Sequence, residues 1–399
     1  MRWASSISTH VSIEGCIEEA VAAVTKQLAG HDPDLTLIFV SPQFRQQYRI
    51  IPQLLRDKMP VGTLLGCSGG GIIGAGREVE HHPAFSITAA HLPGVAIQPI
   101  HSETVDLPDP ETAPSVWREW LGVAGEKEPQ FVVLADPFSF HGEEFLAGMD
   151  FAYPNASVVG GLASGANSSG GNALYLDDKI YNMGMVGVAL SGNIQMDTIV
   201  AQGCRPIGKP MSITKCDQTL LQELDGKPPL EILEEMVDSL TEYDRKLLRT
   251  SLFLGIEMDP LKEDPGQGDF LIRNLMGVDR ETGSVSIGAL LREGQLVQFH
   301  LRDRVMSAED LKVMLSRYQS KGGWREAKGA LLFSCLGRGE YLYGAPNHDS
   351  DVFKTKIGNI PLGGFFCNGE IGPVGRATFL HGYTSSFGIF RPSETSGNT

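Results

Sequence analysis

The segment GCSGGG, residues 66–71, closes a pattern that this chain of 399 residues repeats three times. It contains Cys67-Ser68-Gly69 and follows a helical stretch and a short apolar run. A second copy ends in Ala163-Ser164-Gly165, and a third ends in Cys367-Asn368-Gly369. Each copy has the pattern of an apolar strand, a helical segment and a second apolar strand. The repetition predicts an α/β protein with mixed sheets, built from repeated strand–helix–strand units and organised as two related halves.

The first strand of each unit is mostly apolar and lacks an alternation of polar residues, which is typical of a strand buried on both faces. These strands are expected at residues 35–40 (LTLIFV), 131–136 (FVVLAD) and 330–335 (ALLFSC). Parallel strands need long connections that contain a helix, and such crossovers are right-handed. We therefore expect both strands of each unit to point the same way and to end at one sheet edge.

Other segments predict further elements. Residues 13–28 carry an apolar stripe at helical spacing, and shorter helices are expected near residues 51–55, 143–153 and 351–356. Additional strands are expected at residues 84–92, 94–101, 185–190 and 251–258. The segment LQELDGKPPL, residues 221–230, contains turn residues that suggest a domain boundary. This divides the chain into domains at 5–225 and 226–391, with a disordered polar tail at 392–399.

The segment at residues 66–71 also fits one catalytic motif and, together with residues 72–74, one cofactor-binding motif. The residues that follow it argue against both interpretations. As a hydrolase elbow, G-x-S-x-G needs its serine at the start of a helix. The residues after Ser68 leave little room for one, and Asn368 occupies the equivalent position in the third unit. As a dinucleotide motif, G-x-G-x-x-G needs the same helix for the pyrophosphate. Neither an acyl nucleophile nor a nucleotide cofactor is predicted.

Composition excludes several classes of partner. The formal net charge of −15 opposes binding to nucleic acid and to anionic membranes, which rely on clustered lysine and arginine. No segment approaches the ~20 apolar residues of a membrane helix, and the N-terminus lacks a signal peptide pattern. The six cysteines form no C-x-x-C pair, so no metal site is expected and the thiols should be reduced. These features predict a cytoplasmic protein without a metal or other cofactor.

Longer segments resemble a known family. The C-terminal segments LLFSCLGRGEYLYG, IPLGGFFCNGEIGPVG and TFLHGYTSSFGIF together resemble the FIST domain, named for F-box and intracellular signal transduction proteins. The N-terminal segments ISTHVSIEGCIEEAV, LTLIFVSPQF, LLGCSGGGIIG and VVGGLASG resemble its FIST N portion. The resemblance covers residues 5–391 and implies a sensory module that binds a small ligand such as an amino acid. No F-box-length segment precedes residue 5, and no enzymatic activity follows from the resemblance.

The candidate ligand-binding residues lie where the predicted strands end, because ligands of parallel α/β units bind beyond the carboxyl ends of strands. Glycines there allow close backbone approach to a ligand. The candidates are Cys67, Ser68, Gly69, Ser164, Gly165, Cys335, Arg338, Gly339, Cys367, Asn368, Gly369 and Glu370. Ser41 and Asp136 follow two of the first strands.

The third unit carries the most specific expectation. Cys335 and Cys367 should end neighbouring parallel strands, which places Arg338 and Glu370 over one pocket, with Ser68 and Ser164 lining equivalent turns elsewhere. A cation and an anion at one edge would suit a zwitterion such as an amino acid. Alternatively, Arg338 and Glu370 pair with each other and hold two loops together.

Three functions remain open. The first is a non-enzymatic signal transduction protein that senses a small ligand and acts on a signalling protein. The second is a thiol-dependent enzyme or redox sensor that uses Cys335 and Cys367, since Arg338 would favour the thiolate of Cys335. The third is a partner-binding scaffold of the ubiquitin-ligase type, which would expose a large apolar patch.

Overall fold

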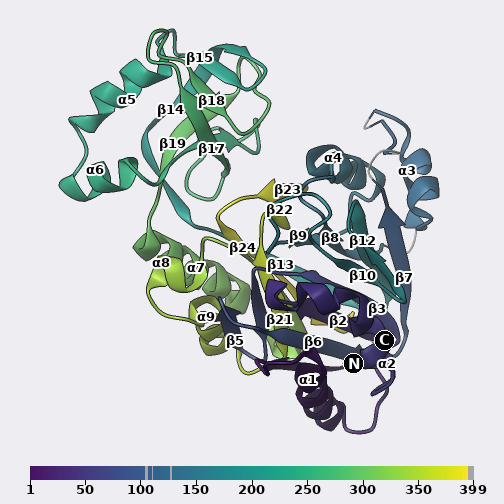
Figure 1. Ribbon diagram of the computed structural model, residues 1–399. Helices are drawn as coiled ribbons and strands as arrows, with labels where there is room; N and C mark the ends of the chain where they lie inside the picture. Colours follow the sequence, from purple (N-terminus) through teal and green to yellow (C-terminus); the bar gives the residue numbers. More distant parts are fainter. Residues whose placement is uncertain (104–106, 110, 126–127, 394–399) are drawn as a thin grey trace. The chain divides into compact units, whose positions relative to one another are not determined.

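The computed structural model describes residues 1–103, 107–109, 111–125 and 128–393. The chain forms two compact units (Figure 1). Unit 1 comprises Met1–Val200, Leu311–Leu380 and Thr384–Thr399, and unit 2 comprises Ala201–Asp310 with His381–Tyr383. Most of the predicted tail at 392–399 lies outside the described residues.

Unit 1 contains the three predicted parallel strand pairs. β2 (Leu35–Val40) pairs with β3 (Thr63–Ser68), β8 (Gln130–Ala135) with β9 (Val158–Leu162), and β20 (Gly329–Cys335) with β21 (Leu362–Cys367). A helix lies in each connection: α2 (Ile51–Arg56), α4 (Gly142–Ala152) and α9 (His348–Ile357). The strand–helix–strand units and their parallel direction are confirmed.

Each parallel pair forms the centre of a six-stranded sheet. The first sheet has the order β1-β6-β2-β3-β10-β11, the second β7-β12-β8-β9-β22-β23, and the third β13-β24-β20-β21-β4-β5. The remaining strands are β1 (Arg2–Ser8), β4 (Gly71–Gly74), β5 (Arg77–Glu80), β6 (Phe85–His91), β7 (Val95–Ser102), β10 (Leu174–Leu176), β11 (Lys179–Tyr181), β12 (Met185–Gly192), β13 (Gln195–Gln202), β22 (Glu370–Val374), β23 (Ala377–His381) and β24 (Thr384–Arg391). The repetition is therefore threefold and extends to complete sheets.

The three sheets exchange strands in a cycle. The strand after β3, β4, pairs with β21 of the third sheet. The strand after β9, β10, pairs with β3 of the first sheet, and β22 after β21 pairs with β9 of the second. Each parallel pair is thus completed by a hairpin from another unit, so the turns at the strand ends must cross near one another.

Two equivalent glycines allow the parallel strands to pack closely. Gly160 in β9 has φ +155°, and a Cβ there would lie 1.8 Å from the carbonyl oxygen of Val133. Gly364 in β21 has φ +149°, and its Cβ would lie 1.8 Å from the carbonyl oxygen of Leu332. A residue with a side chain cannot adopt this geometry without moving the neighbouring strand. The close packing of the two strands therefore explains why glycine occupies both positions, without a ligand contact.

Helices bury the apolar stripes that the sequence predicted. α1 (Ile13–Leu28) begins at Ser12, whose side chain accepts a hydrogen bond from Gly15 N, and the cap satisfies a free backbone donor. Its buried residues are Ile13, Cys16, Ile17, Ala20, Val21, Val24 and Leu28, as expected from their spacing. Further helices are η1 (Pro42–Ile50), α3 (Pro114–Leu121), α7 (Arg304–Ser320), η4 (Gly323–Glu326) and α8 (Gly339–Tyr343). Among the described residues, no helix is long and apolar enough to cross a membrane.

Unit 2 is a closed six-stranded barrel, drawn in teal and green in Figure 1. Its strand order is β14-β15-β18-β17-β16-β19. The bounds are β14 (Cys204–Asp217), β15 (Leu220–Leu224), β16 (Leu252–Glu257), β17 (Phe270–Val278), β18 (Val285–Ile287) and β19 (Leu296–Arg302), with helices α5 (Pro229–Val237) and α6 (Glu242–Leu248). Leu254, Val297 and Phe299 belong to its apolar core. The predicted strand at 251–258 is β16 and belongs to this barrel rather than to a repeated unit.

Candidate functional site

The turns that end β3, β9 and β21 are bonded to one another. Ser164 N donates a hydrogen bond to the carbonyl oxygen of Ser68 (3.2 Å), and Gly70 N donates to Ser164 Oγ (2.8 Å). The Ser164 hydroxyl in turn donates to the carbonyl oxygen of Phe366. Asn368 N donates to the carbonyl oxygen of Leu162 (3.1 Å). The expectation that the Ser68 and Ser164 turns lie apart from the third is wrong, because strand exchange brings all three together.

The joined turns have a buried side and an exposed side. Ser68, Ser164 and Cys367 are buried, whereas Gly165 and Asn368 are exposed. Leu336, which follows β20, is 37% exposed, and a Cβ on Gly70 would lie 2.6 Å from its Cδ2. We call Gly70, Gly165, Leu336 and Asn368 the turn edge. It presents an amide side chain, an apolar side chain and glycine backbone on one surface.

A buried polar chain supports the turn edge from behind. The Ser68 hydroxyl donates to Asn172 Oδ1 (3.3 Å) and accepts from Ala173 N (3.1 Å). Asn172 Nδ2 donates to Asp136 Oδ1 (3.2 Å), and Asp136 Oδ2 accepts from Ser139 Oγ (2.8 Å). The sequence indicates Asp136, because it follows a predicted strand. It does not indicate Asn172; the only sequence signal for this residue is its place in the segment GGNAL, shortly after the second turn.

Cys335 and Cys367 are register partners of β20 and β21, so their predicted adjacency is confirmed. Burial raises the pKa of Cys367 well above its ordinary value, and Glu370 adds to the rise. Burial likewise raises the pKa of Cys67. Cys335 is half-buried, and Gly337 N donates to its sulfur (3.5 Å). The buried thiols therefore resist ionisation.

Arg338 lies inside unit 1 and does not overhang the turns. Its guanidinium is fully buried and bonds both carboxylate oxygens of Asp349, with Nε–Oδ2 at 2.9 Å and Nη2–Oδ1 at 3.1 Å. Ser334 Oγ donates to Asp349 Oδ2 (3.1 Å), and His348 Nδ1 lies 3.0 Å from Oδ1. Burial alone would raise the pKa of Asp349, but Arg338 holds it well below its ordinary value.

Glu370 is also buried, and it accepts hydrogen bonds from Thr384 N (3.1 Å) and Thr384 Oγ1 (2.9 Å). Both side chains are buried, so the shared overhang expected for Arg338 and Glu370 is not found. The chain turns inward at Gly339 (φ +66°), where a Cβ would lie 2.2 Å from Glu80 Oε1. Asp349, the actual partner of Arg338, lies in the first turn of α9, and sequence reasoning missed it.

A second buried carboxyl group lies beside this ion pair. Glu78 Oε1 accepts a hydrogen bond from Ser350 N (2.7 Å), and Glu78 is 5% exposed. Burial raises its pKa to about 8, and repulsion from the Asp349 carboxylate adds to the rise. Glu78 is therefore protonated at neutral pH, while Asp349 carries the charge that neutralises Arg338.

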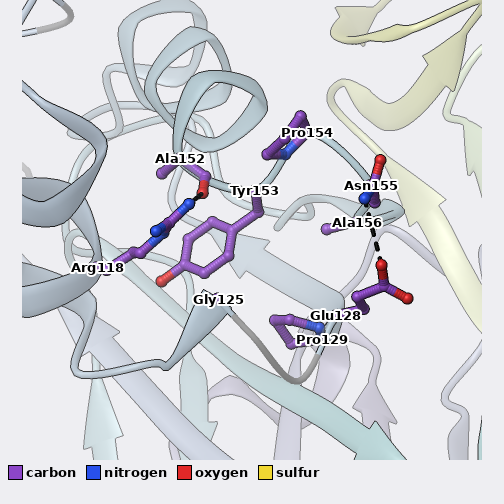
Figure 2. A pocket seen from close by; sticks show the side chains of 9 residues that line it. All are labelled: Arg118, Gly125, Glu128, Pro129, Ala152, Tyr153, Pro154, Asn155 and Ala156. Atoms are coloured by element: carbon purple, nitrogen blue, oxygen red, sulfur yellow. Dashed lines mark hydrogen bonds between the residues drawn. The ribbon is translucent and has the colours of Figure 1, made fainter.

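A hollow of about 190 Å³ lies elsewhere in unit 1 (Figure 2). Arg118 Nε and Nη2 both donate to the carbonyl oxygen of Ala152 (2.9 and 2.8 Å), which lies at the end of α4. The guanidinium carbon lies 5.9 Å from the centre of the Tyr153 ring. On the other side of the hollow, Asn155 Nδ2 donates to Glu128 Oε1 (3.2 Å). The sequence singled out none of these residues.

The models of one protein family match most of this chain. A FIST N domain model matches residues 34–227, and a FIST C domain model matches residues 229–373. Together they cover most of the chain, which therefore belongs to the FIST domain family. The FIST C match includes the barrel strands β16–β19 and the third parallel pair.

Similar proteins include an uncharacterized protein of Mycobacterium tuberculosis, 33% identical over 390 residues, which cover 98% of this chain and 100% of the relative. An F-box/LRR-repeat protein of Arabidopsis thaliana is 26% identical over 292 residues, covering 61% of this chain and 54% of that protein. Cyanuric acid hydrolase from A. caulinodans aligns over 98% of this chain and 100% of its own, with 9% identity and a TM-score of 0.30. That score is too low to establish a shared fold.

Proposed function

We propose that this FIST protein is a cytoplasmic, non-enzymatic signal transduction protein that binds a small ligand at the turn edge. The observation that carries the proposal is the hydrogen bonding of Ser164 to Gly70 and to Phe366. It joins three turns from distant parts of the chain. A small molecule at this place would contact the ends of all three sheets, so its binding would change the stability of unit 1 as a whole.

The chemistry of the turn edge favours a small polar ligand, such as an amino acid. Asn368 offers an exposed carboxamide, whose Nδ2 also donates to the carbonyl oxygen of Ala163 (3.3 Å), and Gly165 offers backbone with φ +92°. Leu336 offers an apolar contact. Because Arg338 is buried against Asp349, a ligand carboxylate would be held by amide groups rather than by a guanidinium. Backbone and amide donors bind carboxylates in other proteins.

The proposed role does not require a reaction. Ser68 Oγ is engaged by Asn172 and Ala173, which supports a structural serine rather than a nucleophile. A redox role for Cys335 and Cys367 remains the second candidate, favoured by their register pairing and by the partial exposure of Cys335. The signal would pass to a partner protein, which would bind unit 1 when the ligand has stabilised it.

Isothermal titration of the purified chain with the twenty common amino acids tests this proposal. Asn368→Ala should weaken the binding of any amino acid that binds by about tenfold, because one hydrogen bond to the ligand is lost. Asn155→Ala, at the hollow of Figure 2, is the matched control and should leave affinity unchanged. A ligand lost in Asn155→Ala or Arg118→Met but retained in Asn368→Ala would place the site in the hollow and contradict the proposal. If none of the twenty amino acids binds, the proposal that the ligand is an amino acid is contradicted.

A further inference from the structure

Unit 2 carries three polar side chains in which at least one buried atom has no hydrogen-bond partner among the described residues. They are Gln202 Oε1, His300 Nε2, and Nε with Nη2 of Arg302. Gln202 is 2% exposed and His300 is 1% exposed. Nearly all buried polar groups of folded proteins are hydrogen-bonded, so such a cluster calls for an explanation.

The unmatched nitrogen of His300 is a hydrogen-bond acceptor. His300 Nδ1 lies 2.9 Å from the carbonyl oxygen of Gln298, which can only accept, so Nδ1 carries a proton. Burial lowers the pKa of His300 to about 4, and the neutral ring therefore presents a lone pair at Nε2. Gly255 lets the ring lie against β16, because a Cβ there would be 2.5 Å from His300 Cε1.

The amide of Gln202 has a defined orientation. Its Nε2 donates to the carbonyl oxygens of Phe270 (2.9 Å) and Gly268 (3.4 Å), so Oε1 is the atom left without a donor. The ring of Phe270 lies 5.3 Å from the ring of His300. Phe270 thus contacts the side chains of both Gln202 and His300.

Arg302 supplies the complementary donors. It lies two residues after His300 on β19, and residues at this spacing share a face of the strand. Its register partner on β14 is Cys204, which lies two residues after Gln202. The guanidinium carbon of Arg302 is 5.0 Å from the centre of the Tyr383 ring. The centres of the Tyr383 and Phe253 rings are 4.3 Å apart. The side chains of Gln202, His300 and Arg302 therefore border one hydrophobic cluster that includes Phe253, Phe270 and Tyr383.

We propose that this part of unit 2 is a second ligand site, which binds a small 2-hydroxy carboxylic acid. The ligand hydroxyl has one proton and would donate it to His300 Nε2, and the carboxylate would accept from Nε and Nη2 of Arg302. The apolar part of the ligand would contact Phe253 and Tyr383. This site is independent of the turn edge and does not depend on the function proposed for it.

The test uses three probes that differ by one group. Lactate has both the hydroxyl and the carboxylate, propionate lacks the hydroxyl, and 1,2-propanediol lacks the carboxylate. Each is titrated into the full chain labelled with ¹⁵N-histidine, and the ring nitrogen resonances are followed by NMR. Lactate should shift the Nε2 resonance of His300 saturably, whereas the other probes should need concentrations at least about tenfold higher. His300 is recognised as the ring whose Nδ1 proton exchanges slowly and which stays neutral at pH 5.

Arg302→Met tests the carboxylate contact without removing the buried histidine. It should weaken lactate binding by about tenfold, because a charge-assisted hydrogen bond is lost. Arg292→Met, an exposed arginine of the same unit, is the control and should bind lactate normally. The proposal is overturned if all three probes act alike, or if none shifts His300. It is also overturned if, in the presence of lactate, nuclear Overhauser effects show an ordered water and no lactate beside His300 Nε2.

Discussion

The hydroxyl of Ser164 lies 2.8 Å from Gly70 N, and the same hydroxyl donates to the carbonyl oxygen of Phe366. One side chain thereby connects three turns that are separated by about 100 and 200 residues in the sequence. The connection exists because each parallel strand pair receives a hairpin from another unit. It makes the stability of the three sheets interdependent.

Ser164→Ala should lower the free energy of unfolding by about 1–3 kcal/mol, because it leaves Gly70 N and the Phe366 carbonyl without their partner. Urea unfolding followed by circular dichroism measures the change. Ser169→Ala, at an exposed position close in sequence, should have little effect. Equal stability of the two variants would show that Ser164 does not join the turns.

Asp349→Asn should destabilise the protein by about 3–5 kcal/mol, because a buried arginine loses its counter-charge. Asp351→Asn, at an exposed site on the same helix, serves as the control. The double variant Arg338→Met with Asp349→Leu should recover much of the loss, since neither charge remains buried. If the double variant is less stable than Asp349→Asn alone, the account of this pair is wrong.

The stability of the protein should depend on the ionisation of Glu78. In the unfolded chain Glu78 ionises near its ordinary pKa of 4.5, whereas its folded pKa is about 8. Between these values the unfolded state releases a proton that the folded state keeps. The free energy of unfolding should therefore fall as pH rises through this window, by at most about 1.4 kcal/mol per unit, and level off above it.

Glu78→Gln should remove this contribution, so the difference between wild type and variant should change with pH between 4.5 and 8. Denaturant titrations at several pH values measure it. Glu144→Gln, at an exposed position of α4, should follow the wild-type pH profile. A constant difference between wild type and Glu78→Gln would mean that Glu78 is already ionised in the folded protein.

Gly364→Ala should destabilise unit 1 by at least about 1–3 kcal/mol, since the backbone conformation is strained for alanine. The clash of the new Cβ with Leu332 O adds to that cost. Gly277→Ala provides the contrast, because its Cβ would meet nothing within 4 Å. Thermal unfolding of both variants measures the difference, and similar melting temperatures would contradict the close packing of β20 and β21.

Thiol labelling at neutral pH should distinguish the two candidate functions. Cys335 and Cys216 are partly exposed and should react first, whereas Cys67 and Cys367 should react only on unfolding. Mass spectrometry of the labelled peptides gives the order. Rapid reaction of Cys367 in the folded protein would favour the redox candidate over ligand sensing.

Local patterns in the sequence determined the elements of unit 1. The apolar stripe of α1 and the mostly apolar runs of β2, β8 and β20, which lack polar alternation, identify buried elements. Helix-containing connections made the strand pairs parallel and so placed Cys335 beside Cys367. These inferences succeed because side-chain periodicity and crossover geometry depend on neighbours in the sequence.

Only the tertiary structure decided which distant groups meet. Ser68, Ser164 and Asn368 had equivalent places in the repeats, but their joining depends on the exchange of β4, β10 and β22 between sheets. The sequence predicts Arg338 over a ligand pocket, because it does not show Asp349 as the buried partner of this arginine. The gathering of Gln202, His300 and Arg302 likewise depends on how barrel strands align. Pairings between distant segments depend on the free energy of the whole fold, and local sequence patterns do not encode them.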